Sequence, residues 1–127
     1  MIRDGKFAAL LPEWESYISL QSTKHALRYI IGFAAGLHKF QCYPKLKGKV
    51  RAFRFFAEDE KQPFAFIVNK KSLLFYFRLP AVRSGRYVFE SVKSGLPLVR
   101  MNESGEWTVK LRTIEDAQKL CELLDLR

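Results

Sequence analysis

Residues 49–79, KVRAFRFFAEDEKQPFAFIVNKKSLLFYFRL, contain three runs that are rich in aromatic and β-branched side chains. The runs cover residues 49–57, 64–68 and 72–79, and the polar segments EDEKQP and NKK separate them. Short apolar runs at this spacing are typical of a meander, in which consecutive antiparallel strands are joined by hairpins. The stretch therefore predicts the middle of an antiparallel sheet.

Helical spacing precedes these strands. Apolar residues at steps of three and four predict one helix over residues 12–20 and a second over residues 24–37, with Ser22 and Thr23 as N-cap candidates for the second. Residues 39–48 contain a proline, a glycine and several cations, and this composition predicts a connecting loop. Two helices are thus expected to open the domain.

Different elements are expected after the meander. A short helix is predicted within residues 83–94, a final hairpin from residues 98–101 and 107–112, and a last helix capped by Thr113. Consecutive strands joined by hairpins favour one sheet. We predict an α+β fold in a single domain, residues 1–127, with one antiparallel sheet of about five strands and the N-terminal and C-terminal helices packed on one face.

Composition limits the class of protein. A chain of 127 residues that is 48% hydrophobic can form one domain with a real core. Its longest apolar stretch, residues 29–37, is shorter than the roughly 20 residues of a membrane span. The start of the chain lacks the apolar region of a signal peptide, so a cytoplasmic location without membrane contact is expected. The two cysteines, 79 positions apart, belong to no ligand motif, and no metal or cofactor is predicted.

Charge is the strongest signal. The formal net charge is +9, and residues 24–57 contain eight Lys and Arg residues and no acidic residue. A field of one sign attracts polyanions, and the predicted nucleic-acid contacts come from this region, assisted by residues between positions 70 and 86. They are Lys24, Arg28, Lys45, Lys47, Lys49, Arg51, Arg54, Lys70, Lys71, Tyr76, Arg78, Arg83 and Arg86.

The second predicted helix carries a stripe with two interpretations. Its members Lys24, Arg28, Gly32, Ala35 and Lys39 recur at steps of three and four, so they share one face. Small residues between cations would let a phosphate backbone or another helix approach closely. Alternatively, the glycines allow this helix to pack closely on the sheet, while the cations are solvated.

The strands also leave alternatives open. Residues 49–57 place cations and then phenylalanines on one face, which suits either a single-strand binder or a strand buried at one end. Residues 73–77, LLFYF, are apolar on both sides, which favours a central strand covered on both faces. On that interpretation, Tyr76 and Arg78 are the only surface contacts of this strand.

Catalysis has little support in the sequence. The adjacent residues Glu58, Asp59 and Glu60 with Lys61 are the local carboxylates that a metal-dependent nuclease would need, yet adjacency does not place them on one face. Cys42 and the two histidines lack any nucleophile motif. An enzyme is therefore a distant third interpretation.

The amino-acid sequence favours a small basic binding module that engages nucleic acid through phosphate contacts and discriminates little between nucleotide sequences. The alternative is a protein–protein interaction module of inhibitor or immunity type, which docks a basic aromatic surface on an acidic partner.

Overall fold

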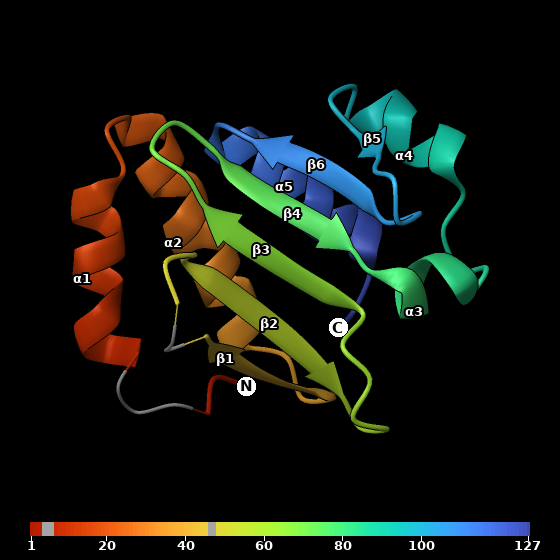
Figure 1. Ribbon diagram of the computed structural model, residues 1–127, viewed down its shortest axis with the longest axis horizontal. Helices are drawn as coiled ribbons and strands as arrows, with labels where there is room; N and C mark the ends of the chain where they lie inside the picture. Colours follow the sequence, from red (N-terminus) through yellow and green to blue (C-terminus); the bar gives the residue numbers. More distant parts are fainter. Residues whose placement is uncertain (4–6, 46–47) are drawn as a thin grey trace.

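The aromatic runs of residues 49–79 form the middle of one antiparallel sheet in the computed structural model, which describes residues 1–3, 7–45 and 48–127 (Figure 1). The elements in chain order are α1 Phe7–Tyr17, α2 Gln21–Ala35, β1 Phe40–Pro44, β2 Ala52–Ala57, β3 Phe64–Val68, β4 Leu73–Phe77, α3 Leu79–Arg83, α4 Phe89–Gly95, β5 Arg100–Met101, β6 Trp107–Leu111 and α5 Ile114–Leu124.

The described strands form a six-stranded sheet in the order β1-β2-β3-β4-β6-β5, and each neighbouring pair is antiparallel. The predicted α+β fold with one antiparallel sheet is confirmed. The additional strand is β1, which lies in the segment predicted as a loop. Its burial alternates over only four residues, with Cys42 and Pro44 buried and Gln41 and Tyr43 half-buried. Pro44 ends the strand at an edge position, where a missing N–H disrupts no interior pairing.

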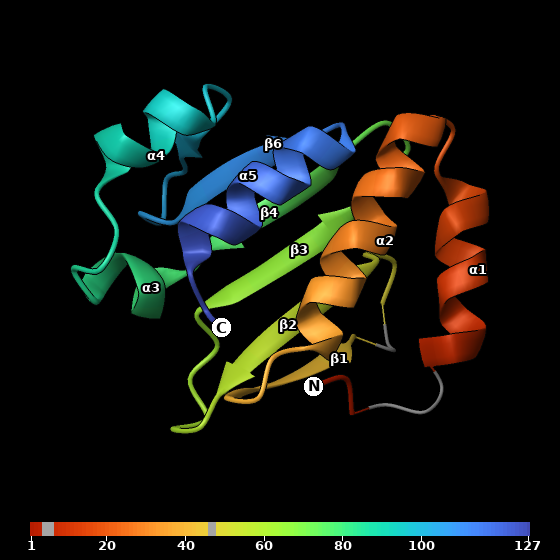
Figure 2. The same cartoon turned by 180° about the vertical axis from the view of Figure 1, so that it is seen from behind.

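Helices α2 and α5 cover one face of the sheet, and α1 lies beside α2 (Figure 2). Side chains alternate across a strand, so every second residue of each strand points into this layer. Phe53, Phe55, Phe66, Phe75 and Phe77 are all fully buried there. The helices contribute Leu27, Ile30 and Leu120, which are also fully buried. The core therefore lies between this face of the sheet and the terminal helices.

No described helix covers the other side of the central strands, which we call the open face (Figures 1 and 2). In β4, Leu73, Phe75 and Phe77 are buried, whereas Leu74 and Tyr76 are half-buried. The prediction that this strand is covered on both faces was wrong. Phe53 and Tyr76 lie on opposite faces, because Phe53 points to the helices and Tyr76 to the open face.

The helix ends differ from the prediction where tertiary contacts decide them. Thr23 does not cap α2; its hydroxyl donates to the carbonyls of Lys71 and Arg112 at 3.0 and 3.3 Å. The cap of α5 is confirmed, because the Asp116 N–H donates to Thr113 Oγ1 at 3.2 Å. The predicted helix over residues 83–94 is shorter, and α3 precedes it as a separate turn.

The glycines of the second helix do not pack on the sheet. Gly32 is exposed, and a Cβ atom at this position would meet no described atom within 4 Å apart from its chain neighbours and the backbone of its own helix. Gly36 ends α2 as its C-cap residue and is also exposed. The stripe predicted on this helix therefore faces solvent, and the close-packing interpretation was wrong.

Candidate functional site

Cations from separate segments meet at one end of the sheet. The β3–β4 turn lies at this end, because Val68 pairs with Leu73, and the last residue of β6, Leu111, pairs with Leu73 on its other side. The start of β2 reaches the same end, since the Val68 N–H donates to the Arg51 carbonyl at 2.9 Å. Strand pairing thus gathers residues that are far apart in the sequence.

Backbone hydrogen bonds fix these segments to the first two helices. The Ser19 N–H donates to the Lys70 carbonyl at 2.8 Å, and the Thr23 hydroxyl joins the β3–β4 turn to the residue after β6. The Lys45 N–H donates to the Ala52 carbonyl at 2.8 Å. We call the resulting surface the basic end. It consists of Lys24, Lys45, Lys49, Arg51, Lys70, Lys71, Lys110 and Arg112.

None of these eight side chains forms an ion pair with an acidic residue in the described part of the chain. Eight of the 22 Lys and Arg residues lie at the basic end, where the Asp116 carboxylate also accepts from the Arg112 N–H at 2.9 Å. Glu13 lines the same hollow as Lys45, Lys49 and Arg51, and is a carboxylate near these cations. The basic end therefore presents a concentrated positive field to solvent.

Arg51 has a fixed position within the basic end. Its Cζ atom lies 3.4 Å from the centroid of the Tyr17 ring, and Lys70 Nζ lies 5.9 Å from the same centroid. Cations over an aromatic face are attracted by its quadrupole. Tyr17, the last residue of α1, therefore holds the Arg51 guanidinium against its ring.

Other predicted contacts lie elsewhere or are already paired. Arg28 forms an ion pair with Glu15 at 2.9 Å, and this hydrogen bond lowers the pKa of the Glu15 carboxyl. Arg83 lies in α3 and Arg86 follows it, beyond the opposite end of β4, where Arg86 Nη2 is 4.0 Å from an Asp125 carboxylate oxygen. Lys47 lies outside the described residues.

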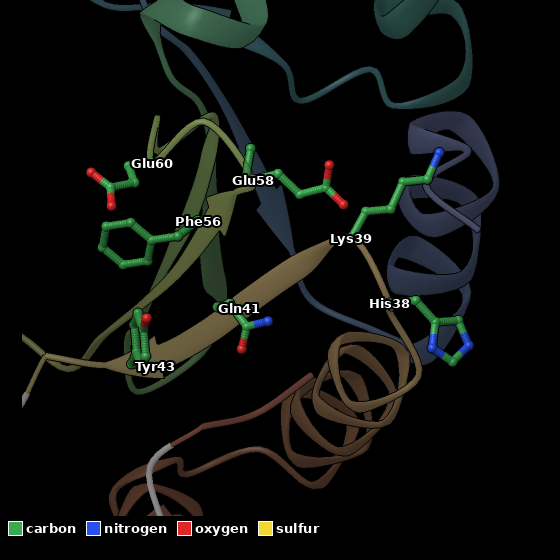
Figure 3. Close-up of a pocket in the computed structure, with 8 residues that line it drawn as sticks. His38, Lys39, Gln41, Tyr43, Phe56, Glu58 and Glu60 are labelled. Atoms are coloured by element: carbon green, nitrogen blue, oxygen red, sulfur yellow. The ribbon is translucent and has the colours of Figure 1, made fainter.

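The acidic loop after β2 borders a hollow of about 610 Å³ at the β1 edge (Figure 3). Glu58 points toward Lys39, whereas Glu60 lies on the far side beside Phe56. Asp59 is 3.9 Å from Lys61 Nζ. Among the described residues, no three His, Cys, Asp or Glu side chains form a group able to hold a metal ion. The carboxylates considered for a nuclease are therefore not assembled into a metal centre.

Neither cysteine has the character of a nucleophile. Both thiols are buried, and burial raises the pKa of Cys42 to about 11 and that of Cys121 to about 12. Because the thiolate is the reactive form, a raised pKa leaves both side chains inert near neutral pH. They belong to the core.

The open face contains a groove of about 340 Å³ that leads to the basic end. Its floor is formed by Ala52, Ala65 and Ile67, and the register places Ala65 between Arg54 and Tyr76 on the neighbouring strands. Small side chains between large ones create the depression. Its remaining lining residues are Lys45, Val50, Gln62, Arg78 and Glu106.

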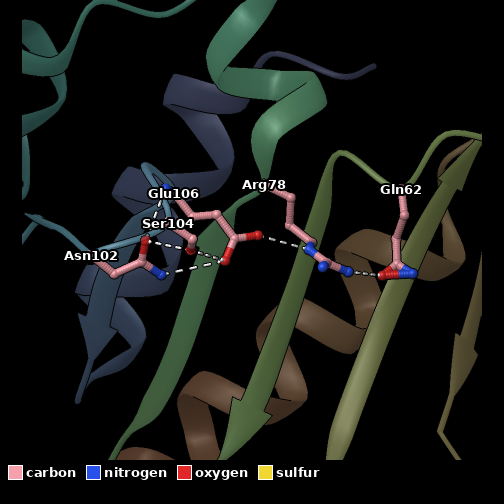
Figure 4. A network of polar contacts seen from close by, with 5 residues as sticks. All are labelled: Gln62, Arg78, Asn102, Ser104 and Glu106. Carbon is pink, nitrogen blue, oxygen red and sulfur yellow. Dashed lines mark hydrogen bonds and ion pairs between the residues drawn. The ribbon is translucent and has the colours of Figure 1, made fainter.

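A polar network lies at one end of this groove (Figure 4). Arg78 Nε donates to Glu106 Oε2 at 2.9 Å, and the Arg78 guanidinium also donates to Gln62 Oε1. The carboxylate of Glu106 accepts from the Asn102 amide at 3.3 Å and from the Ser104 hydroxyl at 3.4 Å. Arg78 is therefore a positioned donor whose charge is largely neutralised by Glu106.

Arg54 forms the wall of the groove opposite Tyr76, and unlike Arg78 it has no ion pair with a described acidic residue. Its Cζ atom lies 5.4 Å from the centroid of the Phe56 ring. Its buried Nε atom has no hydrogen-bond partner among the described residues. Burial and the Glu106 carboxylate raise the pKa of Tyr76 across the groove, so its phenol stays protonated. The two walls therefore offer hydrogen-bond donors.

Sequence reasoning missed Lys110 and Arg112 at the basic end and Ala65 in the groove. The alternation of residues 107–112 had already placed both cations on the polar side of a strand. The missing information was that β6 pairs with β4, which brings Lys110 opposite Leu74. Ala65 carried no signal, because its role depends on its larger neighbours.

In the described ranges, every helix is too short or too polar to cross a membrane. Searches of family models, curated proteins and solved structures found no match to this chain.

Proposed function

We propose that this protein is a nucleic-acid-binding module that holds the phosphate backbone on its basic end and reads little sequence. The observation that carries the proposal is the convergence of eight cations, none in an ion pair with a described acidic residue, at one end of the sheet. Lys and Arg side chains that neutralise phosphates release counterions, and this release supplies most of the affinity of nonspecific binding. Such a function fits the cytoplasmic location expected from the sequence.

The arrangement is difficult to explain by stability alone. Like charges held together repel one another and destabilise the folded state. Here the backbone of Lys70 and Lys71 is fixed by hydrogen bonds from Ser19 and Thr23, so the cations are held together by the fold.

A salt titration tests the proposal. A labelled single strand of 12 nucleotides, a duplex and a polyglutamate peptide would be titrated with the protein by fluorescence anisotropy at several KCl concentrations. If all eight cations contact phosphates, log K for the single strand falls with log[KCl] at a slope of roughly −5.6, from about 0.7 per contact. Fewer contacts give a proportionally smaller slope.

The peptide distinguishes the alternative function. A module for an acidic protein partner uses the same cations, and it would bind polyglutamate at least as tightly as either nucleic acid. That result, or an absence of nucleic-acid binding at 50 mM KCl, would overturn the proposal. Tighter binding of either nucleic acid, with a linear salt dependence, supports it.

A further inference from the structure

Building on the proposed function, we infer that the groove of the open face is a subsite for one base of a single-stranded nucleic acid whose backbone continues onto the basic end. A strand held only by phosphates would leave its bases in solvent. The groove offers an apolar floor beside the cations, and its volume of about 340 Å³ lies within the range of about 300–1,000 Å³ typical of small-molecule sites.

The shape of the groove suits a flat ring. Arg54, Ala65 and Tyr76 occupy three neighbouring strands in register, so the two walls stand roughly 10 Å apart, twice the strand spacing. Ala65 is only 9% exposed, because the walls rise on either side of its small side chain. A ring that enters between the walls would contact the methyl groups of Ala65 and Ala52 below it.

The chemistry of the walls suits a base. Unpaired bases of single strands stack on aromatic rings and on guanidinium planes, and their edges accept hydrogen bonds. Tyr76 and Arg54 supply one group of each kind. The Arg54 Nε donor is buried without a described partner, and it would reach an acceptor on the base edge once the guanidinium turns from Phe56 toward the groove.

Charge sets the direction of the nucleotide. One end of the groove carries Glu106, which neutralises Arg78 and repels a phosphate. The other end carries Lys45, which belongs to the basic end and has no ion pair with a described acidic residue. The phosphate therefore lies toward Lys45, and the base lies between Arg54 and Tyr76. This polarity joins the subsite to the basic end in one continuous path.

Abasic strands test the subsite separately from the phosphate contacts. Twelve-nucleotide oligo-dT and oligo-rU would be compared with abasic strands of the same length and backbone by fluorescence anisotropy at fixed salt. One stacked base contributes at least about a fivefold preference for the base-bearing strand. We expect that preference in the natural protein for the DNA strand, the RNA strand or both.

Two variants and a control test whether the preference for base-bearing strands depends on the groove. Ala65→Leu fills the floor, so we expect it to abolish the preference and to leave affinity for the abasic strand unchanged. Arg54→Gln lowers the preference without filling the groove, and it serves if the first variant fails to fold by circular dichroism. Thr108→Leu adds an apolar side chain to the open face outside the groove lining, and it should keep the preference.

The outcomes separate the two proposals. Equal affinity of the natural protein for base-bearing and abasic strands would overturn the base subsite while leaving the phosphate contacts intact. A preference that survives in a folded Ala65→Leu variant, or that is undiminished in Arg54→Gln, would also overturn it. If neither kind of strand binds, the proposed function itself fails, and the subsite fails with it.

Discussion

The two lysines of the β3–β4 turn allow the phosphate contacts to be counted. Lys70→Gln combined with Lys71→Gln removes two exposed cations from the basic end. The hydrogen bonds that anchor this turn use the backbone carbonyls of these residues, so they remain in the variant. The fold should therefore be retained, and a change in binding can be attributed to charge.

The expected loss follows from counterion release. For a single strand, each phosphate contact contributes about 0.7 to the slope of log K against log[salt], so two lost contacts reduce the slope by about 1.4. With equal affinities at 1 M KCl, a slope difference of about 1.4 makes the variant bind about 25-fold more weakly than the natural protein at 0.1 M KCl. Fluorescence anisotropy over this range measures both quantities.

A second double variant controls for net charge. Arg83→Gln combined with Lys93→Gln also lowers the net charge from +9 to +7, and both residues are exposed on α3 and α4, away from the basic end. We expect its slope to stay within about 0.3 of the natural value, since a change of 0.7 would correspond to one lost contact. The reasoning is refuted if the lysine variant keeps the natural slope, or if the control loses as much.

Three further predictions concern the fold. Gly32→Ala should stabilise the protein by about 1 kcal/mol in urea denaturation, because the site is helical and open. Gly85 is equally open but has a φ of +74°, so Gly85→Ala should destabilise the protein by about 1–2 kcal/mol in the same assay. The same sign for both changes would contradict this reasoning. Cys42 and Cys121 should resist a thiol reagent at pH 8 until guanidinium unfolds the protein. Because burial raises the pKa of both thiols, the free energy of unfolding should fall as the pH rises from about 9 toward 11. Thr113→Ala should cost about 1 kcal/mol, and Thr113→Ser should recover most of it.

Elements that depend on neighbouring residues were predictable from the sequence. The strand over residues 64–68 was predicted with the bounds that β3 has, because aromatic residues and turn signals lie next to each other along the chain. The same holds for α5, whose cap joins Thr113 to Asp116 three positions later. Local chemistry decides such features.

Features that depend on long-range pairing were not predictable. Residues 78–106 separate β4 from β6, yet these strands are neighbours in the sheet. Their pairing places Lys110 and Arg112 beside the β3–β4 turn. The strand LLFYF shows the same limit, since its pattern is equally apolar whether one face or both are covered.

The candidate site was predicted in composition and not in arrangement. The acid-free stretch identified Lys45, Lys49 and Arg51, which the fold retains at the basic end. Arg28 and Arg86 were indistinguishable from them in sequence, because their partners Glu15 and Asp125 lie 13 and 39 positions away. Which cations are free to bind a ligand is a property of the folded chain.

The uneven placement of charge along the strands also gives the molecule an electric dipole moment. Its positive pole is the basic end, while the loop that carries Glu58, Asp59 and Glu60 follows β2 at the opposite end. A polyanion at a distance beyond contact would exert a torque on such a body and turn the basic end toward itself. Encounters would then begin already oriented, and added salt would slow association as well as weaken the complex.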